Sequence, residues 1–214
     1  MMFVKDNLRI SAVNRQTGQV KVKVRTLEDK KMTARGTTVP VGSGLRIAPG
    51  FVASAVDEET GIETALEAHY RRDEGRYVVT AIVNRAISEE FDSEALRRMS
   101  SSGILQAAIP KCISIDIFED GNWTTVANIS AVEGRLIPEW LAKEVVKRGQ
   151  TEARMDVIEI LYGASALAGL PPVKAVQREL DVPHRTASDW IMKARKAGRL
   201  EGMNYAVGRQ AESQ

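Results

Sequence analysis

The side chains best suited to bind a charged partner are concentrated near the end of the chain. Between Pro171 and Arg199 the sequence holds seven basic and three acidic residues, so this stretch carries a net charge of about +4. The whole chain has a formal net charge of only +2, and its remainder is close to neutral. A local excess of this kind indicates either a solvated helix face or a surface for phosphate groups, and charge alone does not decide between them.

Residues that could support catalysis have no productive spacing. Gly42-Ser43-Gly44 lacks the spacing of a dinucleotide-binding fingerprint, and the chain has no phosphate loop ending in Gly-Lys and Ser or Thr. The run Ser100–Gly103 has no evident base beside it. No pairing of an acid with a base stands out among the carboxylates, which include Glu58, Glu59, Asp116, Glu119 and Asp120. We therefore predict that the chain is not an enzyme and has no catalytic residues.

The composition is that of an ordinary globular chain. Of the 214 residues, 43% are hydrophobic and 27% are charged. No apolar run approaches the ~18 residues of a membrane span, and Met1–Ile10 lacks the apolar centre of a secretory signal. Two histidines (His69 and His184) and one cysteine (Cys112) form neither a disulfide nor a familiar zinc site. We expect a cytoplasmic protein without metal, cofactor or membrane.

The first part of the chain has mainly β-strand patterns. Val20, Val22 and Val24 alternate with basic residues, which predicts a strand with one buried face and one solvated face. Asp120-Gly121 between two apolar runs predicts a hairpin. The other predicted elements are a strand at Leu8–Val13, short strands over Thr37–Val56, a short helix or strand pair at Glu58–Tyr70, a strand at Tyr77–Ile87, a helix at Phe91–Met99, and the hairpin strands Ile113–Ile117 and Trp123–Ile129.

The pattern becomes helical from Pro138 onward. Pro138 suits a first helical position, and Trp140, Leu141 and Val145 would form an apolar stripe. We predict an α+β chain with a β-rich domain at 1–135 for oligomerisation or effector binding, a helix and linker at 136–150, a helical domain at 151–207 and a flexible tail at 208–214.

Three helices are predicted after residue 150. They cover Glu152–Ala168, Val173–Leu180 and His184–Ala197, and the turn Asp181-Val182-Pro183 joins the last two. Two helices joined by so short a turn meet at a steep angle, so that the second can enter the major groove of DNA. This helix-turn-helix packing requires an apolar residue in the turn, a small one at the crossing and a large anchor, which are Val182, Ala187 and Trp190.

The outward face of the helix His184–Ala197 then supplies the candidate contacts. Short polar or bidentate groups read base edges, and basic groups at the helix end meet phosphates. We expect base contacts from His184, Arg185, Ser188 and Asp189, and phosphate contacts from Thr186, Lys193, Arg195, Lys196 and Arg199. The segment Gly198–Tyr205 forms either a small wing or a simple chain end.

A family resemblance supports this interpretation. Its residues are Gly169–Val176, Leu180–Ile191 and Ala194–Leu200, and the most specific are Thr186-Ala187-Ser188 with Trp190-Ile191 and Ala194-Arg195. This stretch resembles the C-terminal helix-turn-helix of actinobacterial and actinophage DNA-binding proteins, which implies a helix-turn-helix fold and binding to double-stranded DNA. No resemblance extends into the N-terminal part.

The chain departs from that family at three positions. The turn residue is usually Gly and is here Asp181, which tolerates a left-handed backbone better than most residues. The small residue usual in the first helix of the motif is Gln177, and the usual Ser cap is Pro183. These changes bear on the helix crossing and on specificity rather than on the fold.

The predicted function is that of a sequence-specific DNA-binding regulator, located at the nucleoid when bound. A single recognition helix reads few base pairs, so we expect a homodimer held by the N-terminal domain. The alternatives are an oligomeric assembly or adaptor protein and, with less support, an enzyme with its site in the N-terminal domain. No residue pattern identifies a small-molecule effector.

Overall fold

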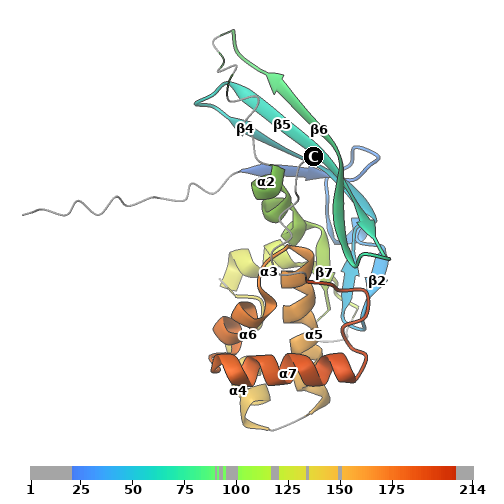
Figure 1. The fold of residues 1–214 in the computed structure, drawn as a ribbon, viewed down its shortest axis with the longest axis vertical. Helices are drawn as coiled ribbons and strands as arrows, with labels where there is room; N and C mark the ends of the chain where they lie inside the picture. The colour runs from blue at the N-terminus through green and yellow to red at the C-terminus, as the bar shows by residue number, and fades with distance from the viewer. Residues whose placement is uncertain are drawn as a thin grey trace, which may run out of the picture.

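The computed structural model describes residues 21–89, 91, 94, 101–116, 121–133, 135–148 and 151–205. Over these residues the chain is α+β, with two four-stranded antiparallel sheets followed by a helical part (Figure 1). The predicted strand Leu8–Val13, most of the predicted helix Phe91–Met99 and the tail 208–214 lie outside the described residues.

The first sheet contains β1 (Val22–Arg25), β4 (Gly50–Asp57), β5 (Ile62–Arg71) and β6 (Arg76–Ala86), in the order β1-β4-β5-β6. The alternation predicted for β1 is confirmed, since Val22 and Val24 are buried while Lys23 and Arg25 are exposed. Helix α2 (Ser101–Ala108) packs against β1, β4 and β5. The segment with an ambiguous pattern, Glu58–Tyr70, forms most of β5, and β6 confirms the strand predicted after it.

The second sheet contains β2 (Val39–Val41), β3 (Leu45–Ile47), β7 (Ile113–Ile115) and β8 (Thr124–Thr125), in the order β2-β3-β7-β8. Short 3₁₀ helices occupy Ala34–Gly36 (η1) and Ile109–Lys111 (η2). Strands β7 and β8 pair antiparallel, as the predicted hairpin requires, while residues 117–120 of the predicted Asp-Gly turn lie outside the described residues. The long second strand predicted at Trp123–Ile129 is wrong, because Val126–Glu133 forms helix α3. The Thr125 hydroxyl accepts from the amide of Asn128 at 3.4 Å, which is a helix-capping contact.

The helical part consists of α4 (Glu139–Lys147), α5 (Glu152–Leu167), α6 (Pro172–Leu180) and α7 (His184–Lys196). The three helices predicted after residue 150 are confirmed to within one residue. Helix α4 is correct in position, and two residues of its predicted stripe are confirmed, since Val145 is buried and Leu141 packs against the core. The third is wrong, because Trp140 is 56% exposed while Ala142 is buried.

One hydrophobic core runs through the sheets and the helices. Helix α5 is its central element, with 12 of its 16 residues buried. Gly163 of α5 lies so close to the second sheet and the chain end that a Cβ there would come 2.3 Å from Leu45 Cδ1 and 2.4 Å from Met203 Sδ. The predicted division near residue 150 therefore does not coincide with a break in packing.

The segment after α7 runs back to the first sheet (Figure 1). Leu200 and Met203 are buried, the Tyr70 hydroxyl donates to the carbonyl of Gly202 at 2.6 Å, and the Asn204 amide donates to the carbonyl of Gly75 at 3.2 Å. The described residues 198–205 contain no strand, so the wing alternative is wrong. The apolar side chains of Leu200 and Met203 are part of the core instead of forming an exposed hairpin.

Candidate functional site

The turn between α6 and α7 has the conformation that its residues predict. Asp181 has φ 51° and ψ 51°, in the left-handed region, and lets the chain reverse after Leu180. Pro183 precedes α7, and its carbonyl accepts from the amide of Ala187 at 3.0 Å. Ala187 is fully buried, as expected for a small residue where two helices cross.

Helix α7 has one apolar and one polar face. Ala187, Ile191 and Ala194 are buried against α5 and α6. Of the nine predicted contact residues, six are exposed and the remaining three, Thr186, Ser188 and Arg199, are partly buried. The exposed ones are His184, Arg185, Asp189, Lys193, Arg195 and Lys196.

One stripe on α7 is exposed at each of its four positions. Arg185, Asp189, Met192 and Lys196 recur at intervals of four, three and four residues, which places them along one side of a helix. Met192, which is 49% exposed, was not among the predicted contact residues, because those were chosen for their polar or charged groups. This stripe offers a guanidinium, a carboxylate, a thioether and an ammonium group to a partner.

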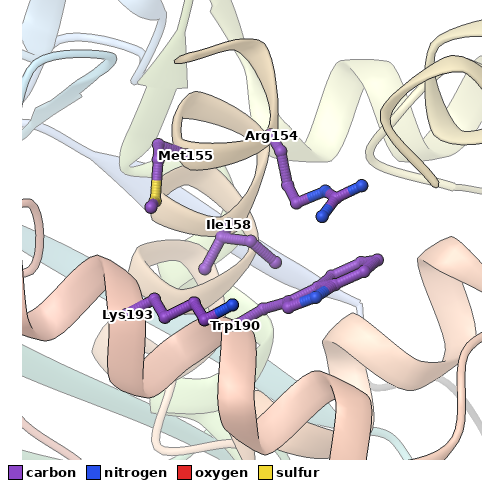
Figure 2. Close-up of a pocket in the computed structure, with 5 residues that line it drawn as sticks. All are labelled: Arg154, Met155, Ile158, Trp190 and Lys193. Carbon is purple, nitrogen blue, oxygen red and sulfur yellow. The ribbon is translucent and has the colours of Figure 1, made fainter. Parts of the chain in front are cut away.

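Trp190 lies beside the buried face of α7 and packs against α5. Figure 2 shows the Arg154 side chain of α5 over the Trp190 ring, and the guanidinium carbon lies 4.2 Å from the ring centroid. Met155, Ile158 and Lys193 surround the same contact (Figure 2). The remaining cavity of about 10 Å³ is no larger than a water site, so the predicted role of Trp190 as an anchor fits its surroundings better than a role in ligand binding.

Arg154 also fixes the end of α4. Its Nε and Nη2 atoms donate to the carbonyl of Val145 at 2.8 and 2.6 Å, and Nη2 donates to Val146 at 3.3 Å. Burial lowers the pKa of the Arg154 guanidinium. These bonds satisfy carbonyls that a helix end leaves unpaired, so one side chain joins α4, α5 and α7.

A buried carboxylate holds α6 in place. Glu179 is 2% exposed and accepts from the backbone amides of Leu136 at 2.8 Å and Ile137 at 3.4 Å. The Arg135 guanidinium donates to the backbone carbonyl of Glu179. Helix α6 is thereby attached to the segment that leads into α4.

Arg199 lies away from the exposed stripe, among carboxylates. It forms ion pairs with Glu152 at 2.5 Å, Asp156 at 3.2 Å and Glu159 at 3.4 Å. Desolvation alone would lower the pKa of Arg199, but the hydrogen bond to Glu152 and the charges of Asp156 and Glu159 raise it overall. These contacts hold Arg199 within the helical part and give it a structural role.

Glu159 connects this cluster to the second sheet. It is fully buried and accepts from the hydroxyl of Ser43 at 2.8 Å, the amide of Gly44 at 3.1 Å and the amide of Ser43. A buried carboxylate is expensive unless it is hydrogen-bonded in this way. Sequence reasoning missed Glu159 because Ser43 and Gly44 lie more than 100 residues away from it. The Gly-Ser-Gly run was the one available signal.

Nothing in the described part of the chain has the form of a metal site, because no group of three or more His, Cys, Asp or Glu side chains could hold an ion there. Among the same residues, no helix has both the length and the apolar character to cross a membrane. No protein-family model, no curated protein and no solved structure matches this chain.

Proposed function

We propose that this protein binds double-stranded DNA sequence-specifically as a transcriptional regulator, with α6 and α7 as a helix-turn-helix and α7 in the major groove. The observation that carries the proposal is the two-faced character of α7. The helix is fixed on one side by Ala187, Ile191 and Ala194, while its other side presents polar groups to solvent. A three-residue turn precedes it, as the docking of a recognition helix requires.

The candidate contacts on α7 are assigned to base edges or to phosphates according to their position along the helix. Those at its beginning, His184, Arg185, Ser188 and Asp189, are assigned to base edges, because the N-terminal part of a recognition helix lies deepest in the groove. Lys193 and Lys196 in the last two turns are assigned to phosphates, and Thr186 is assigned to a phosphate beside the first turn.

Arg195 is exposed but also makes a contact within the helical part. Its Nη2 atom donates to the Tyr162 hydroxyl at 2.9 Å, while the residue as a whole remains exposed. A guanidinium has further N–H donors for a phosphate, but this one is held at Tyr162, so we rank Arg195 below Lys193 and Lys196.

The test is binding of the full chain to labelled duplexes, followed by selection of preferred sites from a random pool. Non-specific binding is expected with a Kd on the order of 10⁻⁴ to 10⁻⁶ M at physiological salt, weakening steeply as salt rises. Replacement of Lys193 and Lys196 by Ala should lower that affinity and the salt slope.

Replacement of Lys23 and Lys30, two exposed lysines outside the helical part, is the matched control and should change neither quantity. A folded chain with no salt-sensitive binding to any duplex would refute the proposal.

A further inference from the structure

The outer half of β6 is exposed along its whole length. All seven residues from Thr80 to Ala86 are exposed, including two large apolar ones, Ile82 at 51% and Val83 at 60%. The inner half differs, since Tyr77 is buried against Phe51 and Tyr70. Strand β6 continues beyond the body of the molecule at this end (Figure 1).

This half is also an edge of the sheet. Strand β5 lies on one side of β6, and no strand of the described residues lies on the other. Exposed edge strands usually carry charges or Pro, because unpaired backbone groups attract another strand. The run Tyr77–Asn84 contains neither, and Arg85 is the one charged residue of the exposed half Thr80–Ala86. The opposite edge, β1, is only four residues long and carries Lys23 and Arg25. Short length and charge both protect an edge strand from pairing with another chain.

We propose that a second copy of this chain pairs with β6, antiparallel, across a two-fold axis that passes beside Val83. Closed two-fold pairs place the same surface on both copies. In this register Val83 faces Val83 of the other copy and Ile82 faces its Asn84. Self-association of this kind does not depend on whether the protein binds DNA.

The charges on the outer face fit this register. Ala81, Val83 and Arg85 alternate on one face of β6. Arg85 of one copy then lies opposite Ala81 of the other copy. Within that other copy, the cross-strand partner of Ala81 is Glu67 on β5. Within its own chain Arg85 pairs with Glu63 of β5, and one oxygen of Glu67 contacts His69 at 2.6 Å. Because Ala81 is small and a guanidinium has five N–H donors, Arg85 can keep its pair with Glu63 and reach across Ala81 to the second oxygen of Glu67. Two-fold symmetry forms this Arg85–Glu67 pair twice.

The same register sets where pairing stops. The β5–β6 ladder is irregular between Glu67 and Ala68, and Thr80 is the extra residue of β6 at that point. A bulge bends an edge and ends regular pairing. Pairing from Ala81 to Arg85 therefore covers the regular, exposed part of β6 and leaves out the buried part.

Cysteine cross-linking of the full chain tests this geometry directly. The native Cys112 is fully buried, and burial raises the pKa of its thiol, so an introduced cysteine would be the reactive one. In Val83→Cys the two thiols would face each other, with Cα atoms about 4.5–5.5 Å apart, within the range of a disulfide.

Ala81→Cys is the matched control, because it lies on the same face and strand but opposite Arg85 rather than itself. We expect a disulfide dimer from Val83→Cys under mild oxidation and none from Ala81→Cys. Equal cross-linking of the two variants would overturn the register, and a monomer by light scattering at high concentration without cross-linking would overturn the interface.

Charge exchange gives an independent check. Arg85→Glu should weaken self-association by about tenfold, since like charges would then oppose each other. Adding Glu67→Arg to that variant should restore it, which a merely destabilised sheet would not do. All measurements are made without DNA, so that failure here is distinguishable from failure of the proposed function.

Discussion

The guanidinium of Arg154 lies 4.2 Å from the centre of the Trp190 ring while its nitrogen atoms donate to the carbonyl of Val145. A cation over an aromatic face is stabilised by the charge distribution of the ring, and a partly buried pair gains more than an exposed one. This one contact joins three helices, so the position of α7 depends on it.

Trp190→Ala should therefore destabilise the protein. Removing a large aromatic side chain from a core costs roughly 3–5 kcal/mol, and we expect about 3 kcal/mol here because Trp190 is only partly buried. Trp190→Phe keeps a ring beneath Arg154 and should lose less. Urea unfolding of both variants measures the difference; an alanine variant of unchanged stability would mean that the buried face of α7 is assigned wrongly.

The left-handed backbone at Asp181 gives a second prediction. A residue with a Cβ loses about 1–2 kcal/mol in that region and a β-branched residue fits it worst, whereas Gly adopts it freely. Asp181→Gly should be neutral or stabilising, and Asp181→Val should lower the free energy of unfolding by about 1–2 kcal/mol. Equal stability of these two variants would contradict the turn conformation.

Gly163 and Gly103 form a natural pair for a third test, since both lie within helices. Gly163→Ala would force a Cβ against Leu45 and Met203, and overpacking of this kind costs about 1–3 kcal/mol. A Cβ at Gly103 meets nothing within 4 Å, so Gly103→Ala should stabilise the protein by about 0.5–1 kcal/mol through helix propensity. Thermal unfolding of both variants should give shifts of opposite sign.

The proposed division of labour on α7 gives a fourth prediction. Arg185→Ala should cost roughly 1–3 kcal/mol of binding free energy on the preferred site and relax preference at one base pair. Lys196→Ala should weaken binding to all sequences about equally and lower the salt slope by about one. Binding to a panel of duplexes at two salt concentrations separates the two effects.

Arg199→Ala is the informative control for that experiment. Its carboxylate partners hold Arg199 within the helical part, so the loss should appear as reduced stability, roughly 1.5–3 kcal/mol for hydrogen bonds to charged groups, rather than as weaker binding. An Arg199→Ala variant that is stable but binds DNA poorly would instead indicate that Arg199 contacts a phosphate.

Local signals predicted the helical part well. Pro171-Pro172, Asp181 and Pro183 mark where helices begin and end, and apolar spacing gave the buried face of α7. The same reasoning assigned Trp140 to the core of α4, because an amphipathic pattern identifies a helix but not which of two neighbouring apolar residues is covered. The strand predicted at Trp123–Ile129 extended too far, into α3, and the Thr125 cap was a local sign of the change.

Long-range contacts could not be predicted in this way. Glu159 meets Ser43, and residues 198–205 meet the turn between β5 and β6, through pairings that no short window of sequence contains. The shared core between the sheets and α5 is of the same kind. These contacts decide how the helices sit relative to the sheets, whereas local patterns decide only that the helices exist.

Because residues 198–205 return from the end of α7 to the β5–β6 turn, and α6 is attached at Glu179, α7 is connected to the rest of the molecule at both ends. Two chains joined at β6 would then hold their α7 helices at one separation and one mutual angle. The DNA double helix presents the same groove about every 10 base pairs, so the pair would accept half-sites only in matching helical phase. Adding about 5 base pairs between half-sites would turn the second groove to the far side of the duplex, and adding about 10 would return it to the near side.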